Sequence, residues 1–223
     1  MITSIIPILC NEKNMANYAY LIKPQNSSNV IIIDAAEANP IINVLEKLNL
    51  NPTHILTTHH HFDHVEGNIK LKEKYNLKII APEYEFEKVP GADIKAQENT
   101  TINIENINFQ PILAQGHTNG HMMYYIKDED ALFTGDVLFN LCVGGLFEGT
   151  RTQMFDTLNK IKTLPKKTKI YPGHEYTRSA IEEYMLQLKD FDKYLQKMYQ
   201  REQGLLSPSS LEEELLYNPY LRG

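Results

Sequence analysis

The stretch TTHHHFDHVEGN (57–68) places four histidines and an aspartate within six consecutive positions. Unpaired imidazoles are costly to bury, and they repel one another once they are protonated. If the chain stays extended after a preceding strand, His59 and His61 point to the same side. A tight turn into a following helix would carry Asp63 and His64 to a second position. Bound cations explain the crowding, because each of these side chains binds a metal in its deprotonated form.

Hydrophobic periodicity predicts alternating strands and helices on both sides of this cluster. The β-branched run NVIIID (29–34) is typical of a buried strand, and PIINVLEKLNL (40–50) is typical of an amphipathic helix with proline at its start. HILTT (54–58) is expected to be a second strand. GNIKLKEKYN (67–76) predicts a polar helix, and KIIAP (78–82) predicts a third strand. The alternation favours a layered α/β fold.

The middle of the chain predicts paired strands followed by a helix. The segment 101–113 alternates apolar and polar residues around Glu105-Asn106, which favours a hairpin turn. Further strands are expected at 122–126, 131–136 and the start of 169–177. An amphipathic helix is expected over 152–164, with an apolar face formed by Phe155, Leu158 and Ile161.

The C-terminal part of the chain lacks further strand patterns after Tyr176. A helical stripe extends to about residue 203, and Ser209 or Ser210 is expected to cap a final short helix. We therefore expect a catalytic domain over 1–175 and a helical appendage over 176–223. The helical stripe consists of Tyr184, Leu188, Phe191 and Leu195.

Composition restricts the class of protein. The net charge of −6 offers no basic surface for nucleic acid. No apolar run approaches the roughly 20 residues that span a bilayer, and no signal peptide is evident. Cys10 and Cys142 predict reduced thiols rather than a disulfide framework. We expect a cytoplasmic protein, a monomer, that binds neither nucleic acid nor membrane.

Three later loops supply further potential metal ligands. His117 lies in GHTNGH, Asp136 in FTGDVLF and His174 in YPGHEYT, and each of these glycine-bearing loops follows a predicted strand. Strand ends are where α/β sheets usually place their sites. Five histidines and two aspartates therefore suffice for two metal sites. Histidine nitrogen and carboxylate oxygen suit zinc, and also iron or manganese.

The combined pattern THHHFDH, GHTNGH, TGD and GHEYT resembles the metallo-β-lactamase superfamily, whose fold is a four-layer αββα sandwich. The stretches GDVLFNLCVGGLFEGT and YPGHEYT, with SPSSLEEELLYNPYLR at the C-terminus, are similar to the glyoxalase II branch, the hydroxyacylglutathione hydrolases. The resemblance extends over nearly the whole chain. It implies hydrolysis of S-2-hydroxyacyl glutathione, chiefly S-lactoylglutathione, to glutathione and a 2-hydroxy acid such as D-lactate.

The resemblance also implies a role for each ligand. Two divalent metal ions, with zinc expected and iron or manganese as alternatives, would hold a hydroxide that attacks the thioester carbonyl. Asp63 and Asp136 would act in catalysis, Asp136 as a bridge and Asp63 by holding the proton of the hydroxide. The first metal would be bound by His59, His61 and His117, and the second by Asp63, His64 and His174, with Asp136 between them.

Substrate contacts follow from the same resemblance. Phe147, Tyr176 and Arg222 match positions that hold glutathione. The family's basic position in the same loop falls on Gly145. Losing a charged contact to a carboxylate would weaken binding by about 1.5–3 kcal/mol. The sequence therefore predicts a weaker hold on glutathione or a different thiol carrier.

Two alternatives stay open. The first is hydrolysis of a different thioester on the same fold. The second is a persulfide dioxygenase with a single iron on His59, His117 and Asp136, which would leave the second ligand set without a role. His60 is expected to pack or to support the ligands, and His121 to orient its loop by hydrogen bonding.

Overall fold

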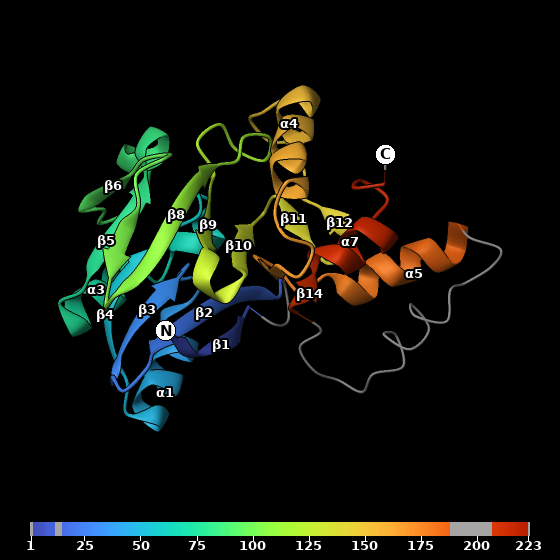
Figure 1. The fold of residues 1–223 in the computed structure, drawn as a ribbon. Helices are drawn as coiled ribbons and strands as arrows, with labels where there is room; N and C mark the ends of the chain where they lie inside the picture. The colour runs from blue at the N-terminus through green and yellow to red at the C-terminus, as the bar shows by residue number, and fades with distance from the viewer. Residues whose placement is uncertain (1, 12–14, 188–206, 223) are drawn as a thin grey trace.

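The computed structural model describes residues 2–11, 15–187 and 207–222 (Figure 1). Two six-stranded sheets lie at its centre. The first sheet is antiparallel between its first three strands and parallel from the third strand onward. In spatial order it contains β1 (Ile2–Cys10), β2 (Asn17–Pro24), β3 (Asn29–Ile33), β4 (Asn51–Leu56), β5 (Lys78–Pro82) and β6 (Ile94–Ala96).

The second sheet is mostly antiparallel, with one parallel pair formed by β10 and β13. A small hairpin of β11 (Leu138–Phe139) and β12 (Cys142–Val143) follows its central strand. In spatial order the sheet contains β14 (Ser209–Ser210), β13 (Lys169–Pro172), β10 (Ala131–Gly135), β9 (Met122–Ile126), β8 (Ile107–Leu113) and β7 (Ile102–Ile104).

Helices cover the outer face of each sheet. Figure 1 shows α1 against β1 to β3 and shows α4 and α7 on the other side of the molecule. Among the described residues, no helix combines the length and apolarity needed to cross a membrane. The α-helices are α1 (Ala38–Leu48), α2 (Phe62–Val65), α3 (Asn68–Tyr75), α4 (Arg151–Lys162), α5 (Thr177–Gln187) and α7 (Leu211–Tyr217), with 3-10 helices η1 (Glu83–Lys88) and η2 (Lys127–Glu129).

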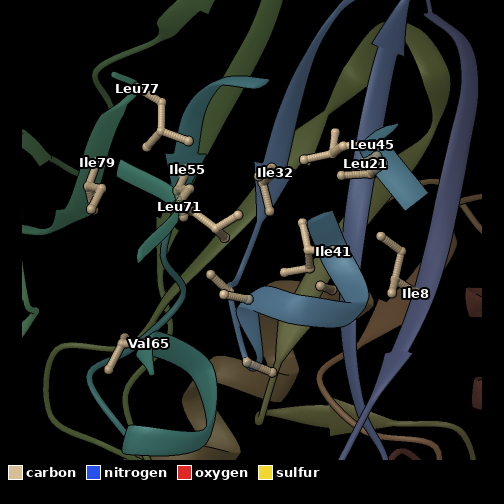
Figure 2. Close-up of a cluster of buried hydrophobic side chains, with 14 of the residues drawn as sticks. Ile8, Leu21, Ile32, Ile41, Leu45, Ile55, Val65, Leu71, Leu77 and Ile79 are labelled. Atoms are coloured by element: carbon tan, nitrogen blue, oxygen red, sulfur yellow. The ribbon is translucent and has the colours of Figure 1, made fainter. Parts of the chain in front are cut away.

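Of the four apolar clusters among the described residues, three hold these layers together, and the fourth packs α5 against Leu141. In the first, Ile41 and Leu45 of α1 pack toward Ile32 in the centre of the first sheet (Figure 2). The second core lies between the sheets and contains Tyr20 and Phe133, whose ring centroids are 5.4 Å apart. The third core joins the second sheet to α4 and α7. Helix, sheet, sheet and helix therefore follow in order, and the predicted four-layer αββα sandwich is confirmed.

The strands predicted from periodicity are confirmed over most of their length. The hairpin between β7 and β8 turns at Glu105 and Asn106, whose φ angles are +52° and +61°. Two consecutive positive φ values define the turn that suits the twist of antiparallel strands. HILTT overlaps β4, but this strand begins at Asn51 and ends at Leu56.

Several details differ from the sequence prediction. The strands β1, β2, β6, β11 and β12 were not predicted, and Pro7 in β1 is tolerated because β1 is an edge strand. The expected apolar face of α4 was wrong at Phe155, which is 59% exposed, while Met154 is buried in its place. The two-residue strand β14 extends the second sheet after Tyr176, where no strand was expected.

The C-terminal helix begins as predicted. The Ser210 hydroxyl accepts a hydrogen bond from the backbone N–H of Glu213, and the Glu213 side chain reaches back to the N–H of Ser210. This capping box fixes the start of α7. The helical stripe at Leu188, Phe191 and Leu195 lies outside the described residues, and a domain boundary at 175/176 stays a prediction.

Candidate metal centre

The histidine cluster lies where β4 ends. The chain leaves β4 at Leu56, bends at Thr58, and enters the four-residue helix α2 after His61. The turn into a helix is present as expected, but the bend interrupts the extended segment. It lies beside the segment that follows β3, because β3 and β4 are parallel and end at the same edge.

The second sheet brings its loops to the same place. His117 follows β8, Asp136 directly follows β10, and His174 follows β13. An isolated bridge between Asn17 and His174, together with a 2.8 Å hydrogen bond from Tyr18 N to Gly173 O, links the two sheets here. Residues more than a hundred positions apart therefore meet in one cluster.

All seven predicted ligands are brought together. Three groups of side chains each place one potential donor atom per residue within 4.8 Å of the others. The groups are His59, His61 and His117; Asp63, His64 and His174; and His59, His64 and Asp136.

Asp136 lies between the two histidine sets. Its Oδ2 atom is 3.1 Å from Nε2 of His174 and 3.5 Å from Nε2 of His117. Its Oδ1 atom is 3.2 Å from Nε2 of His64. One carboxylate therefore faces ligands from both predicted sets, as a bridging ligand must.

Hydrogen bonds on the outer side orient three of the rings. Nδ1 of His64 lies 2.8 Å from the Asp34 carboxylate, Nδ1 of His117 lies 2.8 Å from Gly145 O, and Nδ1 of His174 lies 2.7 Å from Met15 O. These partners are oxygen acceptors, so each Nδ1 carries a hydrogen and donates it. The Nε2 atom of each ring therefore faces the cluster, which is the arrangement that supports metal-bound histidines.

His59 provides the test of whether a metal fits. Thr58 Oγ1 donates to Asp34 Oδ2 at 2.8 Å, and it lies 3.0 Å from Nδ1 of His59. Its hydrogen is already used, so it accepts from the imidazole. Nε2 of His59 is then a buried acceptor without a hydrogen-bond partner among the described residues. Such an atom is rare in a folded protein, and a cation would satisfy it.

Burial and charge set the protonation of the cluster. Burial lowers the pKa of His59, His61 and His117, so these rings are neutral and able to bind a metal. Burial also opposes a charge on His64, but the Asp136 and Asp34 carboxylates outweigh it and raise the pKa of His64. A metal binding at Nε2 of His64 would displace that proton.

The two remaining histidines of these loops support their neighbours. Nε2 of His121 accepts a hydrogen bond from the backbone N–H of Asp136 at 3.1 Å, which is the loop-orienting role expected for it. His60 turns away from the cluster, and its Nδ1 lies 2.9 Å from the Glu85 carboxylate.

Sequence reasoning missed three buried polar residues that contact the cluster or its loops. Asn17 Nδ2 donates to Asp63 Oδ2 at 2.9 Å, and Asp34 supports His64. A signal for Asp34 was present, since an apolar strand rarely ends in a buried aspartate without a partner. Asn17 and Glu85 carry no comparable signal in the sequence.

Two of the three predicted substrate residues, Phe147 and Tyr176, lie beside the cluster. The ring of Phe147 is 73% exposed, and its centroid lies 5.3 Å from that of His61. Tyr176 stacks on His174, with centroids 4.7 Å apart and planes inclined by 9°. A hollow of about 350 Å³ above the cluster is lined by Met15, His61, Phe62, Asp63, Phe147, His174 and Tyr176.

A second hollow of about 570 Å³ adjoins the first, because Tyr176 lines both. Arg222 lies on its wall, together with Tyr217 and Tyr220 from the C-terminal segment. Burial raises the pKa of Tyr176 to about 12, so its phenol stays protonated and can donate a hydrogen bond.

Comparisons with known proteins agree with this architecture. Residues 14–174 match the family model described as the metallo-beta-lactamase superfamily. A curated relative from Pelagibacter ubique named hydroxyacylglutathione hydrolase is 40% identical over 216 residues, covering 92% of this chain and 88% of the relative. A relative of the same name from Mesorhizobium japonicum is 36% identical, covering 100% and 88%. Among solved structures, the BLEG-1 B3 metallo-beta-lactamase superposes with a TM-score of 0.78 at 22% identity, covering 99% of this chain and 100% of that one.

Proposed function

This chain belongs to the metallo-β-lactamase superfamily and, within it, to the hydroxyacylglutathione hydrolases, and from that premise we propose that it hydrolyses S-2-hydroxyacyl glutathione. The products would be glutathione and a 2-hydroxy acid, D-lactate in the case of S-lactoylglutathione. The observation that carries the proposal is the convergence of six ligand-type side chains around Asp136 in a chain 36–40% identical to enzymes of that name.

Divalent metals are implied by the family and by the donor set. We propose that His59, His61 and His117 hold one ion, that Asp63, His64 and His174 hold the other, and that Asp136 lies between them. Two such ions lower the pKa of a water molecule and polarise a carbonyl oxygen. Zinc as the metal, a monomer as the functional unit and the cytoplasm as the compartment remain proposals from the sequence.

The chain's own residues prepare the site for this chemistry. Asp34, Gly145 O and Met15 O fix three imidazoles with Nε2 inward, so the ligands need no rearrangement when a metal arrives. Asn17 donates to one oxygen of Asp63. We propose that Asp63 would also hold the proton of the attacking hydroxide.

The leaving group explains why the hollow needs no strong general acid. A thiol has a pKa of about 8.5, so a thiolate departs readily near neutral pH. Apart from the proposed ligands, the described wall of the hollow above the cluster consists of Met15, Phe62, Phe147 and Tyr176. Of these, only the Tyr176 side chain has a hydrogen to donate to the substrate.

We propose that the glutathione part of the substrate extends from the cluster across Tyr176 into the second hollow. Support comes from the position of Tyr176 in both hollows and from the Arg222 guanidinium on the wall of the second. A guanidinium suits a glycyl carboxylate. Gly145 offers no charged side chain to the substrate. A thioester of a different thiol is therefore the alternative substrate for the same hydrolysis.

The test combines two measurements on one purified sample: metal per chain by elemental analysis, and hydrolysis of S-lactoylglutathione beside a thioester that lacks glutathione. About two metal ions per chain with preference for the glutathione thioester would support the proposal. Two metal ions per chain without that preference would support a metallohydrolase that acts on a different thioester. A single iron with oxygen uptake on a persulfide would overturn the hydrolase assignment.

The matched variant is Asp136→Ala, which removes the carboxylate between the two sets. We expect it to abolish turnover and to lower the metal content while far-UV circular dichroism stays unchanged. Full activity in this variant would contradict the two-metal arrangement.

A further inference from the structure

Glu85 is a buried carboxylate outside the ligand set. It lies in η1, directly after β5, and it is 2% exposed. Its Oε2 atom accepts a hydrogen bond from the backbone N–H of His60 at 2.8 Å and lies 2.9 Å from Nδ1 of the same residue. Its Oε1 atom accepts from the backbone N–H of Gly120 at 2.9 Å and from the hydroxyl of Thr118.

These donors belong to two loops that carry ligands. His60 lies between His59 and His61, and Thr118 follows His117. Glu85 therefore accepts hydrogen bonds from residues adjacent to His59, His61 and His117, which together form the complete first metal set. We propose that Glu85 is a positioning residue that ties these two loops together and so fixes the first metal site.

The physical reason lies in the cost of an unsatisfied buried charge. A buried carboxylate is tolerated only while its hydrogen-bond donors stay in place. A movement of either loop would remove donors from Glu85, so the carboxylate couples the position of His59 and His61 to that of His117.

A cation site at His60, Glu85 and Glu148 is a competing explanation, because these side chains place potential donor atoms within 4.8 Å. The hydrogen bonds oppose it. Both oxygens of Glu85 already accept N–H or O–H donors. Lys88 Nζ lies 3.0 Å from Glu148, and Glu148 also accepts from the N–H of Asn119 at 3.0 Å. The two carboxylates of this group are therefore already paired with donors of the protein itself.

The coupling should be selective for one metal. Among the described residues, Glu85 makes no hydrogen bond or ion pair with the second set. His64 and His174 instead depend on Asp34 and on Met15 O. The inference rests on the proposed metal centre, but it needs no assumption about the substrate.

The experiment is a zinc titration of the metal-free protein in competition with a chromophoric chelator. The variant His117→Ala identifies the binding step that belongs to the first set. We expect Glu85→Ala to weaken that step about 10- to 100-fold and to leave the other step unchanged, as is usual when support of a metal ligand is lost. Glu85→Asp keeps the charge but is one methylene shorter, so it should weaken the same step because it cannot reach both loops.

The matched control is Glu83→Ala on the same turn of η1. Glu83 accepts a 2.7 Å hydrogen bond from Gln97 and contacts neither ligand loop through a described hydrogen bond. The Glu83→Ala variant should bind zinc in both steps with the affinities of the wild type. Thr118→Val removes one donor from the Glu85 carboxylate, whose Oε1 still accepts from Gly120 N–H, and it should weaken the first step by about threefold or more.

Two results would overturn the inference. One is a folded Glu85→Ala protein with both zinc affinities unchanged. The other is an equal weakening of both steps, since a general loosening of the fold predicts that. If the Glu85 variants do not fold, the same two results in a folded Thr118→Val protein would overturn the inference. Zinc binding is measured without a thioester, so failure here leaves the proposed reaction untouched.

Discussion

Oδ2 of Asp34 lies 2.8 Å from Nδ1 of His64, and the same carboxylate accepts hydrogen bonds from the N–H and hydroxyl of Thr58 at 2.7 and 2.8 Å. Asp34 has a φ of +54°, a left-handed conformation at the end of β3. One buried side chain therefore supports His64 directly and His59 through Thr58, and so it contacts both predicted metal sets from behind.

Asp34→Asn should weaken zinc binding with little change in fold. Asparagine tolerates the left-handed backbone. Its NH₂ group, however, places a hydrogen-bond donor at a position where a carboxylate oxygen accepts a hydrogen bond. We expect the step assigned to the second set to weaken about 10- to 100-fold. Competition with a chromophoric chelator measures the zinc affinity of this step. The control is Asp93→Asn, which changes a carboxylate in an exposed ion pair with Lys72. An unchanged second step would mean that Asp34 does not orient His64.

Tyr176 is predicted to have two separable roles. Tyr176→Phe keeps the stack on His174 and removes the phenol, so zinc content should stay the same. The KM for S-lactoylglutathione should rise about fivefold, the equivalent of one hydrogen bond of about 1 kcal/mol. Tyr176→Ala also removes the stack and should lower metal affinity. An unchanged KM in the phenylalanine variant would show that the phenol does not touch the substrate.

Gly145→Lys should strengthen binding of a substrate that carries a carboxylate. Gly145 does not have a positive φ, and a Cβ atom there would meet only the exposed ring of Phe147, at 3.3 Å. A charged contact contributes about 1.5–3 kcal/mol, so KM for the glutathione thioester should fall about 10- to 100-fold. A thioester without carboxylates serves as the control substrate. Equal effects on both substrates would contradict a glutathione carboxylate near this loop.

Most of the cluster was predictable because its proposed ligands lie in short motifs. His59, His61, Asp63 and His64 are neighbours in sequence, and each remaining ligand sits beside a glycine after a predictable strand. The supporting residues were not predictable in this way. Asp34 meets His64 across 30 positions, and Glu85 meets Gly120 across 35. Only the folded chain defines such pairs.

The errors in the fold have similar physical causes. The strand β1 was not predicted, and its Pro7 is compatible with an edge strand, which has positions where a missing N–H is harmless. On α4, Leu158 and Ile161 fit an apolar face with either Met154 or Phe155, and sequence periodicity does not separate the two. The neighbouring sheet decides, and it buries Met154.

Glu214 should make stability depend on pH. It is fully buried in α7, its Oε2 accepts from Leu141 N and Asn218 Nδ2 at 2.9 Å each, and burial raises its pKa from 4.5 to about 7. An acid whose folded pKa is raised favours folding below its unfolded pKa, and this stability is lost as pH rises toward 7. The loss would be about 3 kcal/mol.

Glu214→Gln tests this linkage, because the amide oxygen can still accept both hydrogen bonds but does not titrate. Urea unfolding at pH 5 and pH 8 should show a larger decrease for the wild type than for the variant. The comparison between the two proteins cancels other titrating groups. Parallel decreases would mean that folding does not raise the pKa of Glu214.

Gly173→Ala should disrupt metal binding, because the position lies against the cluster. A Cβ atom there would come within 2.2 Å of Asp136 Oδ1 and 2.9 Å of His64 Cε1. Asp34 holds the His64 ring, and His121 holds only the backbone N–H of Asp136, so the Asp136 carboxylate is the group that has to move. Forced overlap in a packed site costs about 1–3 kcal/mol. We expect that strain to appear as displacement of the Asp136 carboxylate and a metal content below that of the wild type.

Gly145→Ala is the matched control, because its Cβ atom would meet only the exposed Phe147 ring, which can turn aside. Zinc per chain after dialysis, measured by elemental analysis, should be lower for Gly173→Ala and unchanged for Gly145→Ala. Circular dichroism checks that both variants fold. A folded Gly173→Ala protein that retains full zinc content would show that Asp136 can move without loss of either metal. It would therefore contradict a fixed bridging carboxylate.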